Sequence, residues 1–131
     1  MKSLFSKIID REIPAYVVAE DDFFIAFLDI NPLSVGHTLI VPKKEVDYFF
    51  DVDDALMSKI MLFSKRVASA IKSATGCRRV GVAVIGFEVP HAHLHLVPMN
   101  GMADINFANP KLKLPKEEFL RIASRISEAL K

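Results

Sequence analysis

Three histidines alternate with apolar residues in one short stretch, Pro90–Pro98, and this pattern constrains the fold more than any other feature of the chain. They are His91, His93 and His95, called here the histidine row. Together with the apolar run before it, the alternation predicts β-strands over 80–85 and 91–97. Alternate residues of a strand lie on opposite faces. The histidine row is therefore predicted to share one face, with neighbours roughly 6–7 Å apart, while the residues between them point into a core.

Imidazole is the side chain whose ordinary charge change falls nearest neutral pH, so three on one face point to proton handling, a nucleophile or a metal. A purely structural row is the weakest reading. A metal site is the serious competitor, because His-x-His on a strand supplies two ligands that suit zinc and other transition metals. The spacing by itself leaves these chemical alternatives open.

The size and charge of the chain favour one globular domain over residues 1–131. Seventeen basic residues face sixteen acidic ones, which gives no basic footprint for a nucleic-acid polymer. The single cysteine, Cys77, rules out an internal disulfide and favours a reducing compartment. The first ten residues lack the apolar core of a signal peptide, and no apolar run approaches the roughly 20 residues that span a bilayer. We therefore expect a cytoplasmic protein without a membrane segment.

The remaining elements follow from apolar spacing and from turn residues. Helices are predicted over 4–9, from the acidic cluster 51–54 up to Gly76, and after Pro115. Residues 29–36 and 99–113 are predicted loops. Further strands are predicted over 16–19, 23–28 and 37–41. Five strands joined mostly by short turns, with one long helix and two terminal helices, predict an α+β domain with antiparallel pairing.

Three segments, in order, resemble the histidine triad (HIT) family, and in particular its Hint-like branch. The histidine row and the apolar residues that follow it, read as His-Ala-His-Leu-His-Leu-Val over 91–97, are similar to the family signature. Asp29–Lys44, with Asp-Ile, Gly-His and Pro-Lys pairs in place, resembles a second conserved stretch. The opening segment Leu4–Pro14 resembles the N-terminal segment of the Hint-like branch.

This resemblance implies a five-stranded HIT-like sheet and a homodimer whose two sheets join into a continuous ten-stranded sheet. It also implies attack on the α-phosphate of a nucleotide joined to a leaving group, with His93 as the nucleophile. His95 and His91 would flank the phosphate as donors, and His37 would support the row or help to protonate the leaving group. No metal and no other cofactor is needed for this chemistry.

The resemblance also places a purine nucleotide. Asp29 would accept hydrogen bonds from the ribose hydroxyls, although it could equally cap its own loop. Five apolar side chains would surround the base, although such residues more often form a core: Phe5, Ile8, Ile13, Phe27 and Ile30. Candidate substrates are nucleoside phosphoramidates, adenylates and dinucleoside polyphosphates, with an AMP-releasing phosphoramidase first among them.

Two departures from the family pattern bear on function. Many relatives build a structural zinc site from two cysteines and a histidine, where this chain has Ser3, Ser6 and Glu45, so we expect no zinc there. Phe87 and Glu88 replace polar residues that lie near the phosphate in Hint-like proteins. A carboxylate beside a phosphate repels it, which favours a second hypothesis: a nucleotide-binding regulatory module with little turnover. A third is a metal-dependent hydrolase that uses the histidine row.

Overall fold

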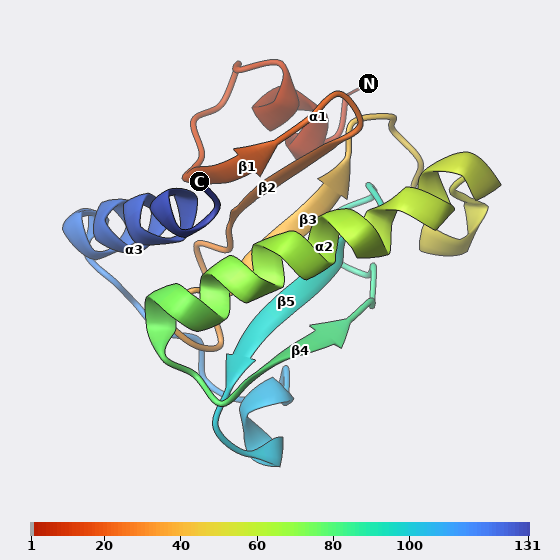
Figure 1. Ribbon diagram of the computed structural model, residues 1–131. Coiled ribbons are helices and arrows are strands. Elements are labelled where there is room, and N and C mark those ends of the chain that lie inside the picture. Colours follow the sequence, from red (N-terminus) through yellow and green to blue (C-terminus); the bar gives the residue numbers. More distant parts are fainter. Residues whose placement is uncertain (1) are drawn as a thin grey trace.

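The computed structural model describes residues 2–131 and contains one five-stranded antiparallel sheet, in the order β1-β2-β3-β5-β4 (Figure 1). The α+β architecture predicted from the sequence is confirmed. The strands are β1 (Val17–Glu20), β2 (Phe24–Leu28), β3 (Thr38–Pro42), β4 (Arg79–Ala83) and β5 (Leu94–Met99). The helices are α1 (Leu4–Ile9), α2 (Asp54–Thr75) and α3 (Lys116–Ala129), with short 3₁₀ turns η1 (Phe49–Asp51) and η2 (Met102–Ile105).

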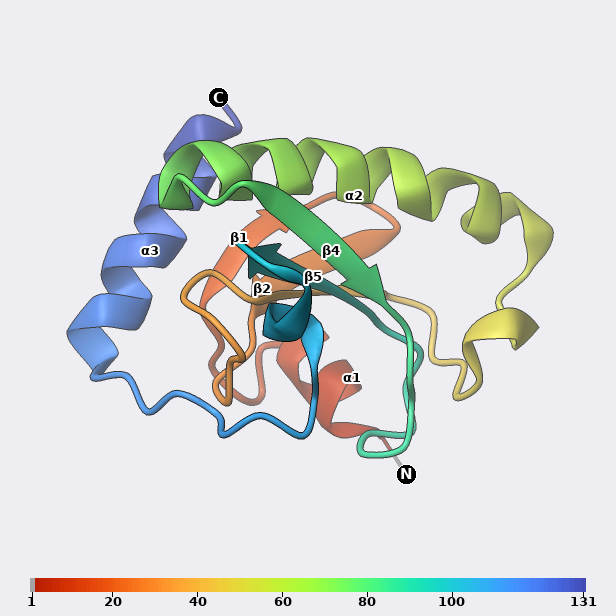
Figure 2. The same cartoon turned by 90° about the horizontal axis from the view of Figure 1, so that it is seen from below.

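The two faces of the sheet are covered unequally. The long helix α2 lies across one face with α3 beside it, and the short α1 lies on the opposite face (Figure 2). The larger core lies under α2 and contains the residues that alternate with the histidines: Ala92, Leu94 and Leu96. A smaller cluster on the α1 side contains Phe5, Ile8 and Phe27. The predicted alternation therefore holds, and the histidine row faces the α1 side.

Local signals at both ends explain the bounds of α2. The Asp53 carboxylate accepts a hydrogen bond from the Leu56 N–H at 2.9 Å, which caps the first turn. Gly76 ends the helix in the left-handed region, with φ 71°, where a residue without Cβ is not strained. The apolar stripe of α2, exemplified by Ile60, Val67 and Ile71, is buried against the sheet.

The last strand begins later than predicted, at Leu94 rather than His91. The ladder between β3 and β5 ends at the pair Ile40 and Leu94, and continuing it would bring Pro42 opposite Ala92. Proline has no N–H to donate. The Ala92 N–H instead donates to the Val46 carbonyl at 2.6 Å. His91 and His93 therefore lie on irregular backbone just before the strand, and only His95 belongs to it.

The segment between β5 and α3 is mostly the predicted loop, although it contains η2. Residues 106–115 then run along the α1 side of the sheet to reach α3 (Figure 2). Within α3, Phe119, Ile122 and Ile126 are buried. No helix formed by residues 2–131 combines the length and the apolar character needed to cross a membrane.

Candidate active site

A cavity of about 510 Å³ opens on the α1 side of the sheet, beside two of the three histidines of the row. Its volume lies within the range of small-ligand sites. The lining residues are Asp29, Asn31, His37, Ile85, Gly86, Phe87, Glu88, His93, His95, Phe107 and Lys111. A wider hollow of about 820 Å³ between β1, α2 and the end of α3 contains no histidine. The groups suited to catalysis thus gather at the smaller cavity.

His93 is held in one tautomer by the backbone. Its Nδ1 lies 2.7 Å from the carbonyl oxygen of His91, and a carbonyl can only accept, so Nδ1 carries the proton. The other ring nitrogen, Nε2, then keeps its lone pair. The ring of Phe5 meets the His93 ring edge-on, with centroids 5.0 Å apart, and fixes its orientation from α1. His93 therefore presents the lone pair of Nε2 at the cavity, which is what a nitrogen nucleophile requires.

His37 and His95 form a directed pair. The Leu33 N–H donates to Nδ1 of His37 at 3.0 Å, so the proton of His37 is on Nε2. That Nε2 lies 2.9 Å from Nδ1 of His95 and donates to it. Nε2 of His95 must then carry the proton of the neutral ring. His95 therefore offers an N–H donor beside the lone pair of His93, the pairing that a phosphoryl group under attack requires.

Burial keeps the His37–His95 pair uncharged at neutral pH. Desolvation lowers the pKa of His37 to about 3, with further contributions from His95 and Lys111. Desolvation lowers the pKa of His95 to about 4, helped by His93. Because both rings are neutral, the relay donates hydrogen bonds without bringing a full positive charge to the phosphate.

His91 lies away from the cavity. It is fully buried, and both of its ring nitrogens have protein partners. Nε2 donates to the Pro42 carbonyl at 2.7 Å, and Nδ1 accepts from the Ser3 hydroxyl at 2.7 Å. Desolvation lowers the pKa of His91, against the effect of the Pro42 carbonyl. His91 is thus absent from the cavity lining that contains His93 and His95.

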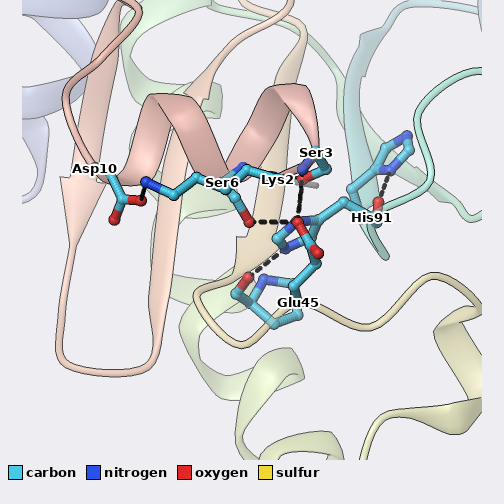
Figure 3. Close-up of polar contacts among 8 residues, drawn as sticks. Lys2, Ser3, Ser6, Asp10, Glu45 and His91 are labelled. Atoms are coloured by element: carbon cyan, nitrogen blue, oxygen red, sulfur yellow. Dashed lines mark hydrogen bonds and ion pairs between the residues drawn. The ribbon is translucent and has the colours of Figure 1, made fainter.

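A polar cluster at the start of α1 seals this end of the row (Figure 3). Glu45 Oε1 accepts from the Ser3 N–H and from the Ser6 hydroxyl, both at 2.7 Å. Ser3 also caps α1, because its Oγ accepts from the Ser6 N–H at 3.0 Å. The hydrogen bonds to Ser3 and Ser6 hold the pKa of Glu45 well below its ordinary value. The positions that differ from the zinc-binding relatives are therefore joined by hydrogen bonds, which tie α1 to the histidine row.

The residues expected around a nucleoside lie in three different environments: the cavity, the smaller apolar cluster and the exposed surface. Asp29 lines the cavity; its Oδ1 accepts from the Asn31 N–H at 2.8 Å, and its Oδ2 lies 3.6 Å from Nε2 of His37. Burial raises the pKa of Asp29, and the charge of Glu88 adds to this rise. Phe5, Ile8, Phe27 and Ile13 pack together in the smaller cluster, whereas Ile30 is 64% exposed.

Five cavity residues were not singled out from the sequence: Asn31, Ile85, Gly86, Phe107 and Lys111. Phe107 and Lys111 both come from the segment predicted only as a loop, and both line the cavity. No periodicity or motif marks them, because their place depends on how the chain returns across the sheet after β5. Phe87 and Glu88, by contrast, were singled out from the sequence and do line the cavity.

The same groups have the spacing of a metal site. Asp29, His37 and His95 present ligand atoms within 4.8 Å of one another. The Leu33 N–H, however, occupies Nδ1 of His37 and leaves the proton on Nε2, so the nitrogen facing the other two residues has no lone pair for a metal. The hydrogen-bond pattern therefore favours a donor relay at this position.

Comparison with known proteins agrees with this geometry. A family model described as the HIT domain matches residues 10–102. A HIT-like protein of Borreliella burgdorferi is 36% identical over 132 residues, covering 95% of each chain. The adenosine 5'-monophosphoramidase HNT1 of Saccharomyces cerevisiae is 38% identical over 96 residues, covering 72% of this chain and 61% of the yeast protein. A solved Hit-like protein involved in cell-cycle regulation, from Bartonella henselae, has a TM-score of 0.84 at 30% identity and covers 98% of this chain and 96% of its own.

Proposed function

Because this chain belongs to the HIT domain family, we propose that it is a nucleotidyl hydrolase or transferase that acts at the α-phosphate of AMP-linked substrates. The observation that carries this proposal is the tautomer pattern at the cavity. The His91 carbonyl leaves a lone pair on His93 Nε2, and the relay from Leu33 through His37 leaves a proton on His95 Nε2. One nitrogen can attack phosphorus while its neighbour stabilises the phosphate oxygens.

The proposed reaction has two displacements. His93 Nε2 forms a bond to the α-phosphorus, and the bond from phosphorus to the leaving group breaks; a leaving amine takes up a proton from the solvent as it departs. Water then attacks the nucleotidyl-histidine, gives up a proton to the solvent, and releases AMP with the His93 lone pair restored. His95 donates to the phosphate oxygens, on which charge develops in both steps.

The nucleoside end of the site is proposed from the same cavity. Asp29 Oδ2 is the oxygen left over after the Asn31 N–H takes Oδ1, and it would accept from the ribose hydroxyls. The purine would lie on the α1 side of the sheet, next to the cavity. Its proposed contacts are Phe5, Ile8, Ile13, Phe27 and the exposed Ile30.

An adenosine phosphoramidate is the first substrate to test. The name of the yeast relative, an adenosine 5'-monophosphoramidase, supports this choice. Adenylates and dinucleoside polyphosphates share the same α-phosphate chemistry and remain in the proposed range. A binding module with little turnover is the second candidate, and the specific observation in its favour is that Glu88 and Phe87 line the cavity where a leaving group would lie.

We also propose a homodimer formed through β4. This strand is at the edge of the sheet, and an edge strand presents unpaired N–H and C=O groups. Val82, Val84 and Ile85 leave apolar surface exposed along or just after it, at 49%, 36% and 45%. Antiparallel pairing of two copies of β4 would give the ten-stranded sheet. Light scattering should find a dimer for the wild type and a monomer for Val82→Lys.

Intact-protein mass spectrometry after rapid mixing with adenosine phosphoramidate tests the catalytic proposal. The wild type should release AMP and, on rapid quench, carry an adduct of one AMP; His93→Ala should do neither. Turnover that survives in His93→Ala would remove the proposed nucleophile. AMP binding without turnover or adduct in the wild type would select the binding module. Loss of wild-type turnover in a chelator would select the metal-dependent hydrolase.

A further inference from the structure

After the last strand, the chain returns to the cavity and forms part of its lining. Residues 106–112, called here the strap, lie beyond the part of the chain that the family model matches, which ends at residue 102. The strap runs on the same side of the sheet as α1 (Figure 2), and it supplies the half-buried Phe107 and the cation Lys111 to the cavity lining.

The Phe107 ring covers the His37–His95 pair. Its centroid lies 4.8 Å from that of His95, with the rings at 71°, and 6.1 Å from that of His37, with the rings at 78°. Both contacts are edge-to-face arrangements, which favour a fixed mutual orientation. The ring thus lies against both partners of the hydrogen bond that assigns the His95 tautomer.

The need for such a contact follows from the few restraints on His95. Among residues 2–131, the only hydrogen bond recorded for its ring is the one to His37. One hydrogen bond leaves a ring free to tilt about that bond, and water that reached the pair would compete for it. His93 has the same single ring hydrogen bond and is additionally held edge-on by Phe5. His93 and His95 therefore share one pattern: a hydrogen bond on Nδ1 and an aromatic ring against the imidazole.

Hydrogen bonds within the strap and to a neighbouring loop hold Phe107 in place. The Lys111 ammonium donates to the carbonyl oxygens of Phe107 and Asn109, the latter at 3.1 Å, and so closes the turn on itself. The Leu112 N–H donates to the Pro32 carbonyl at 2.9 Å, which ties the strap to the loop between β2 and β3. That loop also carries Asp29 and leads into His37. The strap and the relay are therefore anchored to the same piece of backbone.

We propose that Phe107 is a positioning residue for His95, as Phe5 is for His93, and that Lys111 clasps the strap so that Phe107 can do this. The proposal deepens the proposed function, because it rests on His95 acting as the phosphate donor. The charged or titratable groups that line the same cavity are His93, Asp29, Glu88 and Lys111, besides His37 and His95 themselves.

The test compares four variants of the full chain. Phe107→Ala removes the ring, and Phe107→Leu keeps apolar cover of similar size. Lys111→Met removes the clasp, and Lys113→Met removes an equal charge from an exposed position just outside the strap. The measurements are kcat and KM for adenosine phosphoramidate, and the NMR titration of the His95 imidazole, which requires no turnover.

We expect Phe107→Ala to lower kcat by between about 10- and 100-fold, the scale of a misplaced catalytic group, with a smaller change in KM. The His95 pKa should rise towards its ordinary value, because water then solvates the charged ring. Phe107→Leu should restore most of the activity. Lys111→Met should show the same changes in weaker form, and Lys113→Met should show none.

Two results would overturn the proposal. One is a Phe107→Ala variant with the wild-type His95 titration. The other is a Lys113→Met variant that matches Lys111→Met, because the effect would then come from charge and not from the clasp. If the wild type turns over no phosphoramidate, the proposed function fails, but the NMR comparison still decides whether Phe107 controls His95.

Discussion

The two ends of the histidine row carry the same side chain only two to four residues apart in sequence, yet their surroundings are opposite. At the sealed end, His91 is fully buried and both of its ring nitrogens are bound, by Ser3 and by the Pro42 carbonyl. At the open end, His93 and His95 each have one nitrogen bound through Nδ1, and both line the cavity. A ring nitrogen without a protein partner is what distinguishes a group available for chemistry.

This contrast separates a structural role for His91 from the chemical roles of His93 and His95. His91, at the sealed end, acts on His93 through its backbone, because the carbonyl that fixes the His93 tautomer belongs to His91. The Ser3–Glu45 cluster holds this end of the row and the start of α1 together, and α1 supplies the Phe5 ring to His93. Substitutions at the sealed end should therefore act on stability, and substitutions at the open end on chemistry.

The largest effect is expected from a matched pair of substitutions at His95. In His95→Asn, the side-chain oxygen can replace Nδ1 as the acceptor from His37, but nothing reaches the position of Nε2–H. In His95→Gln, the amide N–H can reach that position. Loss of one donor to a developing oxyanion costs about 10²–10³-fold in kcat, so we expect that loss for Asn and a smaller one for Gln, measured with adenosine phosphoramidate. Equal losses would show that the donor is not what His95 contributes.

The next effect belongs to the sealed end. His91→Leu leaves the Ser3 hydroxyl and the Pro42 carbonyl without their partner in a buried place. Leaving a buried polar group unsatisfied costs about 1–3 kcal/mol, so the free energy of unfolding should fall by that order, measured by urea denaturation at fixed protein concentration. The adduct at His93 should still form in the fraction that remains folded. A stable His91→Leu protein that forms no adduct would place His91 in the chemistry and break the comparison.

A third prediction concerns how protonation of His95, at the open end, makes stability depend on pH. The pKa of His95 is lowered to about 4 in the folded protein, below its ordinary value of 6.5. Between these two pH values the imidazole is protonated in the unfolded chain but not in the folded protein. The free energy of unfolding is therefore at its maximum for this group above pH 6.5, and it falls as the pH drops towards 4. Each such proton contributes about 1.4 kcal/mol per pH unit. In His95→Gln, the change of the free energy of unfolding with pH should be smaller by the contribution of one proton, measured by urea denaturation from pH 7 to pH 4.5.

The sequence allowed the fold and the centre of the site to be predicted because both depend on local patterns. Alternation placed the histidine row on one face, and Gly76 and the acidic cluster at Asp53 set the ends of α2. The start of β5 was wrong because a proline on the neighbouring strand ends the ladder, which is a property of the pair and not of either segment. Phe107 and Lys111 were missed because only the tertiary path of the strap brings them to the histidines.

The smallest expected effect comes from a matched pair of glutamates, one at each end of the row. Glu88 lines the cavity near Asp29, and its exposed carboxylate should disfavour an anionic leaving group. Glu88→Gln should raise kcat/KM for a diadenosine polyphosphate, relative to adenosine phosphoramidate, by roughly 2–5-fold, because a solvent-exposed charge is worth at most about 1 kcal/mol.

Glu45→Gln, at the sealed end, should leave that substrate ratio unchanged and lower the denaturation midpoint, because Glu45 accepts from Ser3 and Ser6 and touches no part of the cavity. A changed substrate ratio in Glu45→Gln would show that the two ends are coupled. An unchanged ratio in Glu88→Gln would show that the leaving group lies away from Glu88. The expected pattern, a changed ratio for Glu88→Gln and an unchanged one for Glu45→Gln, would assign contact with the leaving group to the open end of the row alone.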